Sequence, residues 1–438
     1  MKRRLRSLLR WLYPGMRIKR WISLSFVSMA LIVIGFLILF GVDLVRMVYA
    51  YVPQAPVARA LWVTGFFIVG AVGFGFSLFR LVRSVARGVA PAAREKTSAL
   101  IYRTRILEAA PRVVAIGGGT GLSTLLRGLK EVTANLTAVV TVTDDGGSSG
   151  RLRREMDALP PGDVRNCILA LAEDESRLSE LFQYRFTEPE TLAGHSLGNL
   201  VLAGLEQASG GFDRAIEAMS QFLSVRGRVL PTTLVKCQLV ATMADGERVE
   251  GESRIAADPR PIASLTLSTS PVPAYTAVIE AILEADLVIV GPGSLYTSII
   301  PNLLVDGVAE AIAASSAEKF LIANLMTQPG ETEHYSLGDH LRTLASYAPI
   351  AQFDAIVVNS EIPDAALLDE YRSEEAELVA DDLQEANEYG LRVIRTALIG
   401  TARWAGKETV KHSPSKLAKT IVENARAFSS QRKERLTP

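Results

Sequence analysis

The stretch from Arg112 to Arg154 constrains the fold of this 438-residue chain more than any other. An apolar run over 113–116 fits a buried strand of a parallel sheet, and the glycine turn Gly117–Gly121 follows it directly. Leucines then recur at helical spacing over 122–129. A strand, a glycine turn and a helix in this order predict a phosphate site. Glycines let the backbone approach a ligand closely, and the free N–H groups of a helix start point toward an anion.

Two further polar loops follow predicted strands. A strand over 137–143 runs into Asp144–Gly150, and a strand over 287–290 runs into Gly291–Ser298. Because the carboxyl ends of parallel strands share one edge of a sheet, we expect the three loops to converge on one pocket. A single loop of this kind could equally be a turn without a ligand, since Leu122 stands where G-x-G-x-x-G requires its third glycine. Asp144 and Asp145 could likewise cap the next helix.

The N-terminal part predicts a membrane anchor. A basic tail over 1–20 precedes two uncharged apolar runs, about 21–42 and 61–79, within a hairpin over 21–80. Each run is long enough to cross a bilayer, for which about 20 residues suffice. We therefore predict a multi-pass protein of the plasma membrane. Both outer flanks are basic, so the positive-inside rule places both termini and the main domain in the cytoplasm. A cleaved signal peptide is the rival interpretation of the first run.

The segment over 81–110 predicts a basic linker, which could lie on anionic lipid or be a solvated connector. Glycines of the second apolar run (Gly65, Gly70, Gly73 and Gly75) could bring helices together within the hairpin or in a homo-oligomer.

Acidic and basic residues are equal in number, 47 each, so the overall charge gives no sign of nucleic-acid binding. The two cysteines, Cys167 and Cys237, cannot form a cysteine metal site, and we predict no metal.

From Pro111 onward, strands alternate with helices, which predicts an α/β, Rossmann-like domain over 111–427. Its sheet should be largely parallel, with helices on both faces, and a flexible tail should follow over 428–438. Shorter segments over 235–242, 248–254 and 262–267 predict a small antiparallel insertion. A stretch over 400–408 superficially resembles a P-loop but fails in spacing, and Glu408 replaces the required hydroxyl residue.

The candidate ligand-binding residues are the glycines and polar residues of the three loops and of nearby helix starts. They are Gly118, Gly119, Thr120, Gly121, Asp144, Asp145, Gly146, Ser148, Ser149, Arg165, Asn166, Asn199, Gly293, Ser294, Tyr296 and Thr297. Helix-start residues such as Arg165 and Asn199 could instead be solvated or act as caps. We expect His195 to be a hydrogen-bonding loop residue, because nothing near it in sequence is an obvious nucleophile.

Several motifs together resemble those of the gluconeogenesis factor family, also called YvcK. They are GGGTGLSTLLRGLK, TVTDDGGSSGRLR, PPGDVRNCILALA, GHSLGNL, GRVLPTT, GPGSLYTSIIPNLLV and NLMTQPGET. More distantly the chain is similar to 2-phospho-L-lactate transferase, called CofD, which has a Rossmann-like core. The YvcK resemblance implies a protein that binds a UDP-sugar, notably UDP-N-acetylglucosamine. It also implies a role in cell shape and wall synthesis during gluconeogenic growth, with cell-wall synthesis proteins as partners.

The same resemblance implies that Tyr371 and Lys411 contact the sugar nucleotide, with Lys411 replacing an arginine. Family members are not established enzymes, and the sequence shows no clear pair of base and nucleophile. The alternative is a CofD-like transferase that moves a phospholactyl-type group from a nucleotide donor to a deazaflavin acceptor, held by Asp144 or Asp145. A nicotinamide dehydrogenase is a weaker hypothesis, because the dinucleotide fingerprint is incomplete.

Overall fold

The computed structural model describes residues 55–89, 106–382, 384–404 and 407–429, together with scattered positions between 29 and 53. The chain divides into two compact units, Met1–Ile106 and Leu107–Pro438. The basic tail, most of the first apolar run, most of the linker over 81–110 and the C-terminal tail lie outside the described residues. The predicted limits of these segments therefore stay predictions.

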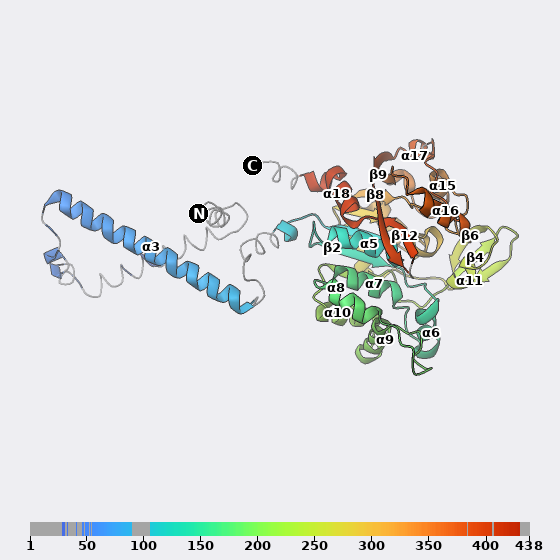
Figure 1. The fold of residues 1–438 in the computed structure, drawn as a ribbon, viewed down its shortest axis with the longest axis horizontal. Coiled ribbons are helices and arrows are strands. Elements are labelled where there is room, and N and C mark those ends of the chain that lie inside the picture. The colour runs from blue at the N-terminus through green and yellow to red at the C-terminus, as the bar shows by residue number, and fades with distance from the viewer. Residues whose placement is uncertain are drawn as a thin grey trace. The chain divides into compact units, whose positions relative to one another are not determined.

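The N-terminal unit contains one long helix, α3, over Pro56–Val89 (Figure 1). Within it, residues 56–76 are long and apolar enough to cross a membrane, judged by length and composition, and the described residues do not bury this stretch. This helix includes the second predicted apolar run. The two-helix hairpin is not established, because the first run falls almost entirely outside the described residues.

The C-terminal unit is built on a seven-stranded sheet with the order β10-β9-β8-β7-β1-β2-β3. All its neighbouring strands pair in parallel. The strands are β1 Val113–Gly117, β2 Leu136–Val140, β3 Arg228–Pro231, β7 Leu287–Val290, β8 Glu318–Ile322, β9 Ala355–Asn359 and β10 Arg392–Thr396. Every residue of β1, β2, β7 and β8 is buried. Strands covered on both faces carry continuous apolar runs, so the predicted parallel sheet is confirmed.

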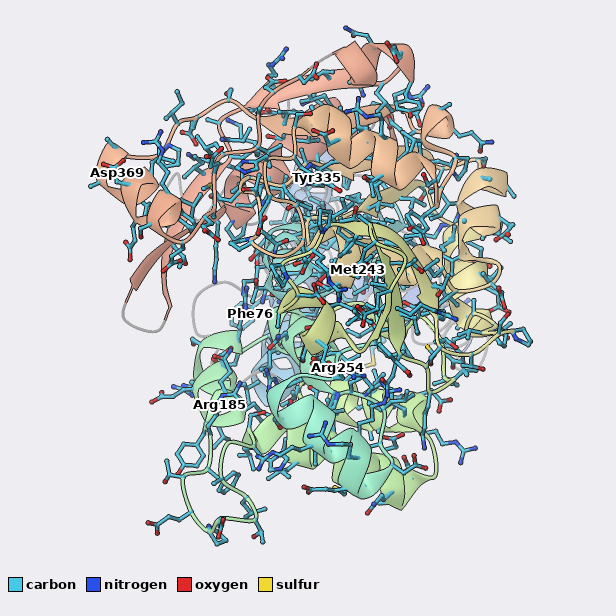
Figure 2. The ribbon with its side chains drawn as sticks, turned by 90° about the vertical axis from the view of Figure 1, so that its right-hand side faces the viewer. Phe76, Arg185, Met243, Arg254, Tyr335 and Asp369 are labelled. Carbon is cyan, nitrogen blue, oxygen red and sulfur yellow. The ribbon has the colours of Figure 1, made fainter. Side chains whose placement is uncertain are left out.

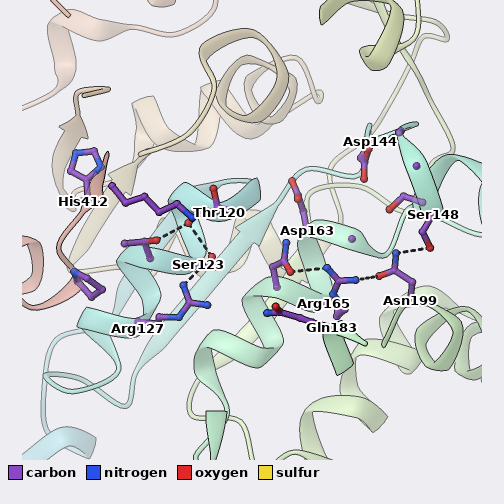
Figure 3. Close-up of a pocket in the computed structure, with 18 of the residues that line it drawn as sticks. Thr120, Ser123, Arg127, Asp144, Ser148, Asp163, Arg165, Gln183, Asn199 and His412 are labelled. Carbon is purple, nitrogen blue, oxygen red and sulfur yellow. Dashed lines mark hydrogen bonds between the residues drawn. The ribbon is translucent and has the colours of Figure 1, made fainter. Parts of the chain in front are cut away.

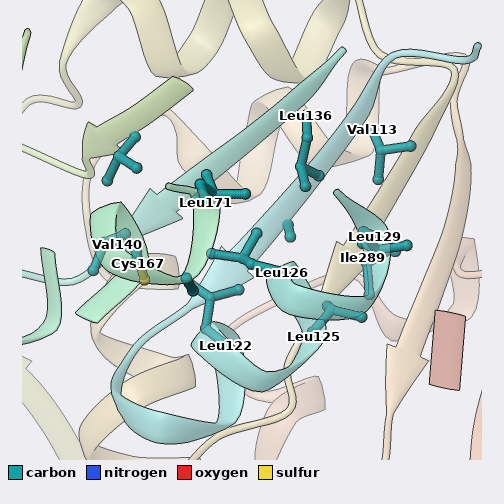
Figure 4. Packing of buried hydrophobic residues seen from close by; sticks show 14 of the residues in the cluster. Val113, Leu122, Leu125, Leu126, Leu129, Leu136, Val140, Cys167, Leu171 and Ile289 are labelled. Atoms are coloured by element: carbon teal, nitrogen blue, oxygen red, sulfur yellow. The ribbon is translucent and has the colours of Figure 1, made fainter. Parts of the chain in front are cut away.

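Alternate residues of β1 face two separate hydrophobic cores. Val113 and Ala115 join the core formed with α5 and α7, and Val114 and Ile116 join the core formed with α12 and α14. Leucines of α5 pack on the first face, as Figure 4 shows. Helices on both faces confirm the Rossmann-like, α/β class.

The C-terminal unit contains helices along its whole length, between and after the strands (Figure 1). They are α5 Gly119–Leu129, α6 Gly147–Met156, α7 Gly162–Leu171, α8 Glu175–Gln183, α9 Leu197–Ser209, α10 Phe212–Phe222, α11 Glu252–Ala256, α12 Thr276–Leu283, α13 Ile300–Leu303, α14 Val308–Ala314, α15 Leu337–Ala345, α16 Ala365–Ser373, α17 Gln384–Glu388 and α18 Pro414–Asn424. A π-helical turn over Leu295–Ile299 precedes α13.

The sheet order creates a switch point beside β1. The chain runs outward from β1 through β2 to β3, then returns to place β7 on the other side of β1 and continues outward to β10. The connections after β1 and after β7 therefore diverge at the same edge of the sheet. In open α/β sheets, ligands bind in the crevice formed at such a point.

The predicted β-rich insertion is present between β3 and β7. It is an antiparallel sheet of β4 Leu239–Met243, β5 Arg248–Glu250 and β6 Ile262–Leu267, with Met243 buried inside it (Figure 2). The predicted strand over 248–254 is wrong beyond residue 250. Gly251 has a φ of 101°, which ends the strand and starts α11.

Two parts of the sheet architecture did not follow from the sequence patterns. Strands β3 and β10, at opposite edges of the sheet, were not predicted as parallel strands; in β10 only Ile394 is fully buried. The P-loop-like stretch is a hairpin of β11 Ile399–Trp404 and β12 Lys407–His412.

Helix α5 packs against α18 through a glycine. A β-carbon on Gly128 would lie 2.1 Å from the carbonyl oxygen of Pro414 and 2.9 Å from the β-carbon of Ala418. Gly204, in α9, is exposed and has nothing within 4 Å of the same position. An added methyl group would therefore clash with α18 at Gly128 but would meet no neighbouring atom at Gly204.

We predict that Gly128→Ala lowers the free energy of unfolding by about 2 kcal/mol, because α18 must shift away from α5. Gly204→Ala should raise it by about 0.5–1 kcal/mol through its higher helix propensity. Thermal and urea denaturation followed by circular dichroism measures both. A stabilising Gly128→Ala would contradict the close α5–α18 packing.

Candidate functional site

The loops after β1, β2 and β7 meet around two adjoining cavities of about 700 Å³ and 430 Å³. We call them the basic cavity and the glycine cavity. Both are lined by Thr120, Thr124, Asp144, Asp163, Lys411 and His412. The structure thus brings the three loops together at the switch-point edge of the sheet.

Most of the sequence-predicted site residues line these cavities. The basic cavity is lined by Thr120, Asp144, Gly146, Ser148, Ser149, Arg165, Asn166, Asn199 and Lys411. The glycine cavity is lined by Gly118, Gly119, Thr120, Gly121, Asp144, Gly293, Ser294, Thr297 and Lys411. Asp145, Tyr296 and Tyr371 line neither cavity.

The two adjacent aspartates have different surroundings. Asp144 lines both cavities, and its Oδ1 accepts the N–H of Gly146 at 2.8 Å. The Oδ1 of Asp145 accepts the N–H of Ser253, at the start of α11, at 2.8 Å. Of the two, Asp144 is therefore the residue placed to meet a ligand.

The two predicted tyrosines are also placed away from the cavity walls. The Tyr296 hydroxyl is 2.8 Å from that of Tyr335, and the Tyr296 side chain is buried. The Tyr371 hydroxyl accepts the N–H of Val410 at 2.9 Å, one residue before Lys411 on β12. In this structure Tyr371 holds the strand that carries Lys411, whose side chain lies at the cavities.

The glycine turn joins β1 to α5, as predicted, but the N–H of Gly119 already donates a hydrogen bond to a carboxylate. Gly119 has a φ of 60°, a backbone that glycine adopts without strain. Its N–H donates to Oδ2 of Asp163 at 2.6 Å, from the first turn of α7. A phosphate on this N–H, as the sequence predicts, would have to replace that carboxylate.

Buried carboxyl groups line the site. Burial and the nearby Asp144 raise the pKa of Asp163 to about 6. Burial likewise raises the pKa of Asp144. Burial and the neighbouring carboxylates hold the pKa of Glu252 well above its usual range. These shifts follow from the cost of placing charged oxygens together away from water.

Cationic side chains line the basic cavity together with two of these carboxylates. They are Arg127, Arg165, Arg185 and Lys411. The guanidinium of Arg127 pairs with Glu175, and that of Arg185 donates to the carbonyl of Gly194 at 2.9 Å. The basic cavity therefore holds more cations than carboxylates.

Arg165 is the buried cation of this group, with 7% of its surface exposed. Its Nη1 donates to Oδ1 of Asn199 at 2.6 Å and to the hydroxyl of Ser196, and its Nη2 donates to Oδ1 of Asn166 at 2.9 Å. Within the described residues, no carboxylate lies within 4.0 Å of this guanidinium, and Nε has no partner. Burial lowers its pKa to about 10, so it remains charged at neutral pH. Asp163 and Asp144 act on this guanidinium from beyond ion-pair distance, so no direct ion pair neutralises it. A buried cation without a direct ion pair favours a negatively charged ligand beside it.

His195 is a hydrogen-bonding loop residue, as expected, but its partner is a hydroxyl far away in sequence. Ser148 Oγ lies 2.9 Å from His195 Nδ1, although 47 residues separate them in sequence. Asn199 Nδ2 donates to the same hydroxyl at 3.0 Å (Figure 3). The loop before α9 brings His195 back over the start of α6, a contact that no local pattern encodes. Burial, with a smaller effect of Arg151, lowers the pKa of His195 and so favours the neutral ring.

Several residues that line the site were not predicted as site residues from the sequence. They are Arg127, Asp163, Arg185, Glu252 and His412. Asp163 stood within the motif PPGDVRN, and its place at a helix start after a turn could have marked it. His412 lies on a hairpin, and its only signal was its position next to Lys411. Among the described residues, no group of three or more His, Cys, Asp or Glu side chains is arranged to hold a metal ion.

The fold and the cavities define a class of protein. A parallel sheet with helices on both faces, whose switch-point loops enclose a charged cavity, is an α/β ligand-binding domain of the Rossmann-like type. The family model described as 2-phospho-L-lactate transferase CofD matches residues 113–399. Given this match and the relatives described next, the chain belongs to the gluconeogenesis factor family, within the CofD-like group.

Similar proteins cover the C-terminal unit or nearly the whole chain. The gluconeogenesis factor of Bacillus subtilis is 45% identical over 314 residues, which cover 72% of this chain and 98% of the relative. A relative from Nostoc sp. is 42% identical over 421 residues, which cover 94% of this chain and 92% of the relative, so that similarity extends into the N-terminal unit. A crystal structure of a protein from Bacillus halodurans has a TM-score of 0.68 and 44% identity, and it covers 72% of this chain and 99% of that one.

We predict that Asp163→Asn stabilises the ligand-free protein at neutral pH. The pKa of Asp163 is about 6 in the folded protein and 3.8 without perturbation, so the folded state binds the proton more tightly. This carboxyl therefore lowers stability increasingly as the pH rises from about 4 to 6, and its full cost is present above pH 6. Asparagine removes the charge and keeps an oxygen for the Gly119 N–H. The expected gain at pH 7.5 is on the order of 2 kcal/mol.

Urea denaturation at pH 4 and at pH 7.5 measures this effect. The control is Asp157→Asn, at a largely exposed carboxylate outside both cavities that pairs with Lys236; it should change stability little at either pH. Equal stability of Asp163→Asn and the unsubstituted protein at pH 7.5 would show that Asp163 is not a buried, strained charge.

Proposed function

We propose that this chain is a membrane-anchored regulatory protein that binds UDP-N-acetylglucosamine on the cytoplasmic side. The observation that carries the proposal is the basic cavity, where the buried Arg165 lacks a carboxylate partner within 4.0 Å among the described residues. A diphosphate would bring negative charge to a cavity that Arg165 shares with three other cationic side chains. The volume of about 700 Å³ lies within the usual range for small-molecule sites.

The parts of a sugar nucleotide match different regions of this cavity. We place the diphosphate at the hydroxyl of Ser148, at the start of α6, within a cavity to which Arg165, Arg127 and Lys411 contribute positive charge. The amides of Asn166, Gln183 and Asn199, which also line the cavity, offer donors and acceptors for the sugar or the uracil. This arrangement puts the phosphates nearer to Ser148 than to the Gly119 amide, which Asp163 occupies.

Family membership supports the physiological part of the proposal. The relative from Bacillus subtilis bears the name gluconeogenesis factor. We propose that the fraction of protein with bound ligand depends on the concentration of the sugar nucleotide. The protein would pass this signal to cell-wall synthesis proteins and so affect cell shape during gluconeogenic growth. The anchor would keep this signal at the membrane, where α3 supplies one helix of suitable length.

A CofD-like transferase is the second candidate. The family model bears the name of that enzyme, and the glycine cavity adjoins the basic cavity along Asp144 and Lys411. Two adjoining cavities suit a donor and an acceptor. In this alternative the glycine cavity holds a deazaflavin, and a phospholactyl group passes to it from a nucleotide in the basic cavity.

We predict that UDP-N-acetylglucosamine raises the melting temperature of the full-length protein in detergent, whereas NAD does not. A ligand that binds only the folded state stabilises it by about 2.7 kcal/mol at a concentration 100 times its Kd. Lys411→Met should weaken binding about tenfold by removing a cation next to the phosphates. Lys419→Met is the matched control, because Lys419 lies on α18 outside both cavities. A shift with GDP and a deazaflavin, but none with the UDP-sugar, would favour the transferase.

The membrane arrangement has its own test. We predict that a protease added outside intact spheroplasts leaves residues 107–438 uncut, because the basic flanks keep both ends of the predicted hairpin in the cytoplasm. The C-terminal unit should become sensitive once the membrane is permeabilised. Cleavage within this unit before permeabilisation would overturn the cytoplasmic orientation.

A further inference from the structure

A chain of hydrogen bonds links the buried cation to the hydroxyl at the start of α6. Arg165 Nη1 donates to Asn199 Oδ1 at 2.6 Å, and Asn199 Nδ2 donates to Ser148 Oγ at 3.0 Å. Ser148 Oγ in turn lies 2.9 Å from His195 Nδ1. These four side chains are between 2% and 7% exposed, and Figure 3 shows the part from Arg165 to Ser148.

The donors and acceptors of this chain have a fixed direction at its first two steps. A guanidinium can only donate, so the atom of Asn199 that faces Arg165 must be its oxygen. The amide nitrogen of Asn199 then faces Ser148 and must donate to its hydroxyl. Arg165 thus determines which way the Asn199 amide points, and one lone pair of Ser148 Oγ is always filled.

The tautomer of His195 determines where the Ser148 hydrogen points. If Nδ1 carries no hydrogen, it accepts the hydroxyl hydrogen of Ser148, and the pair has the arrangement of a nucleophile and its base. If Nδ1 carries the hydrogen, it donates to Ser148 Oγ and fills the second lone pair. The hydroxyl hydrogen must then point to a third group, and Ser148 lines the basic cavity.

We propose that His195 is a hydrogen-bond donor in the ligand-bound protein, and that Ser148 gives its hydroxyl hydrogen to an anionic oxygen of the bound diphosphate. The proposal rests on the proposed function, since it names the phosphate contact of the same site. Arg165 is then a positioning residue that acts through Asn199. Its own nitrogens are occupied by Ser196, Asn199 and Asn166, or are buried, so its charge attracts the ligand while Ser148 touches it.

The placement of Ser148 supports this direction of donation. It is the second residue of α6, a ten-residue helix whose first N–H groups favour an anion beside them. The guanidinium of Arg165 is linked to Ser148 through Asn199. With His195 as a donor, as proposed, both lone pairs of Ser148 Oγ are occupied, so the hydroxyl is left to donate its hydrogen rather than to attack an electrophile.

The test compares the affinity of full-length variants in detergent for UDP-N-acetylglucosamine by calorimetry. Ser148→Ala removes the proposed donor, and Asn199→Asp keeps a partner for Arg165 but replaces the N–H that faces Ser148 by an acceptor. Each should weaken binding about tenfold. His195→Asn presents an N–H near the position of Nδ1 but has no basic nitrogen, so it should bind within about threefold of the unsubstituted protein. Ser209→Ala, at the end of α9, is the control that should change nothing.

The outcomes separate this inference from the proposed function. Unchanged affinity in both Ser148→Ala and Asn199→Asp would overturn the inference while leaving UDP-sugar binding in place. A loss in His195→Asn as large as in Ser148→Ala would show that His195 acts as an acceptor or base, and would also overturn it. If the unsubstituted protein does not bind the UDP-sugar, the proposed function fails. Pyrophosphate then serves as the probe, and equal pyrophosphate affinity in Ser148→Ala would overturn the inference by itself.

Discussion

Parallel pairing of β1 with both β2 and β7 is the constraint on which the site depends. Val113–Ile116 matches Leu136–Val139 on one side and Leu287–Val290 on the other, residue for residue. All three strands therefore end at the same edge, and each chain segment leaves the sheet as a polar loop. A strand inserted antiparallel at this point would move one loop to the opposite edge. The cavities exist because three buried strands share a direction.

Electrostatics then determine what this edge can bind. Burial raises the pKa values of the carboxyl groups of Asp144, Asp163 and Glu252. Arg165 lines the same cavity as Asp144 and Asp163, but amide and hydroxyl oxygens hold its guanidinium, and no carboxylate lies within 4.0 Å of it among the described residues. A ligand with two phosphates and a polar sugar would complement the cations and amides of this cavity. The Gly119 amide already has a carboxylate partner in Asp163, so it is a poorer place for a phosphate.

Much of the fold and part of the site could be predicted from local patterns. The apolar runs of β1, β2 and β7 and the loops that follow them are local signals, so they were found. The contact between Ser148 and His195 spans 47 residues and depends on how α6 and α9 pack, so it was missed. The roles of Asp144 and Asp145 could not be separated, because two adjacent residues share one sequence context and differ only in what folds against them. Edge strands β3 and β10 were not predicted because they lack the continuous burial, and so the continuous apolar runs, of the central strands.

A crystal structure of the protein with UDP-N-acetylglucosamine would show whether the basic cavity at the switch-point edge is a diphosphate site. We expect the diphosphate in that cavity, with a phosphate oxygen within hydrogen-bond distance of Ser148 Oγ and with Asp163 still accepting the Gly119 N–H. A diphosphate bound on the Gly119 amide with Asp163 displaced, or bound outside both cavities, would contradict this expectation.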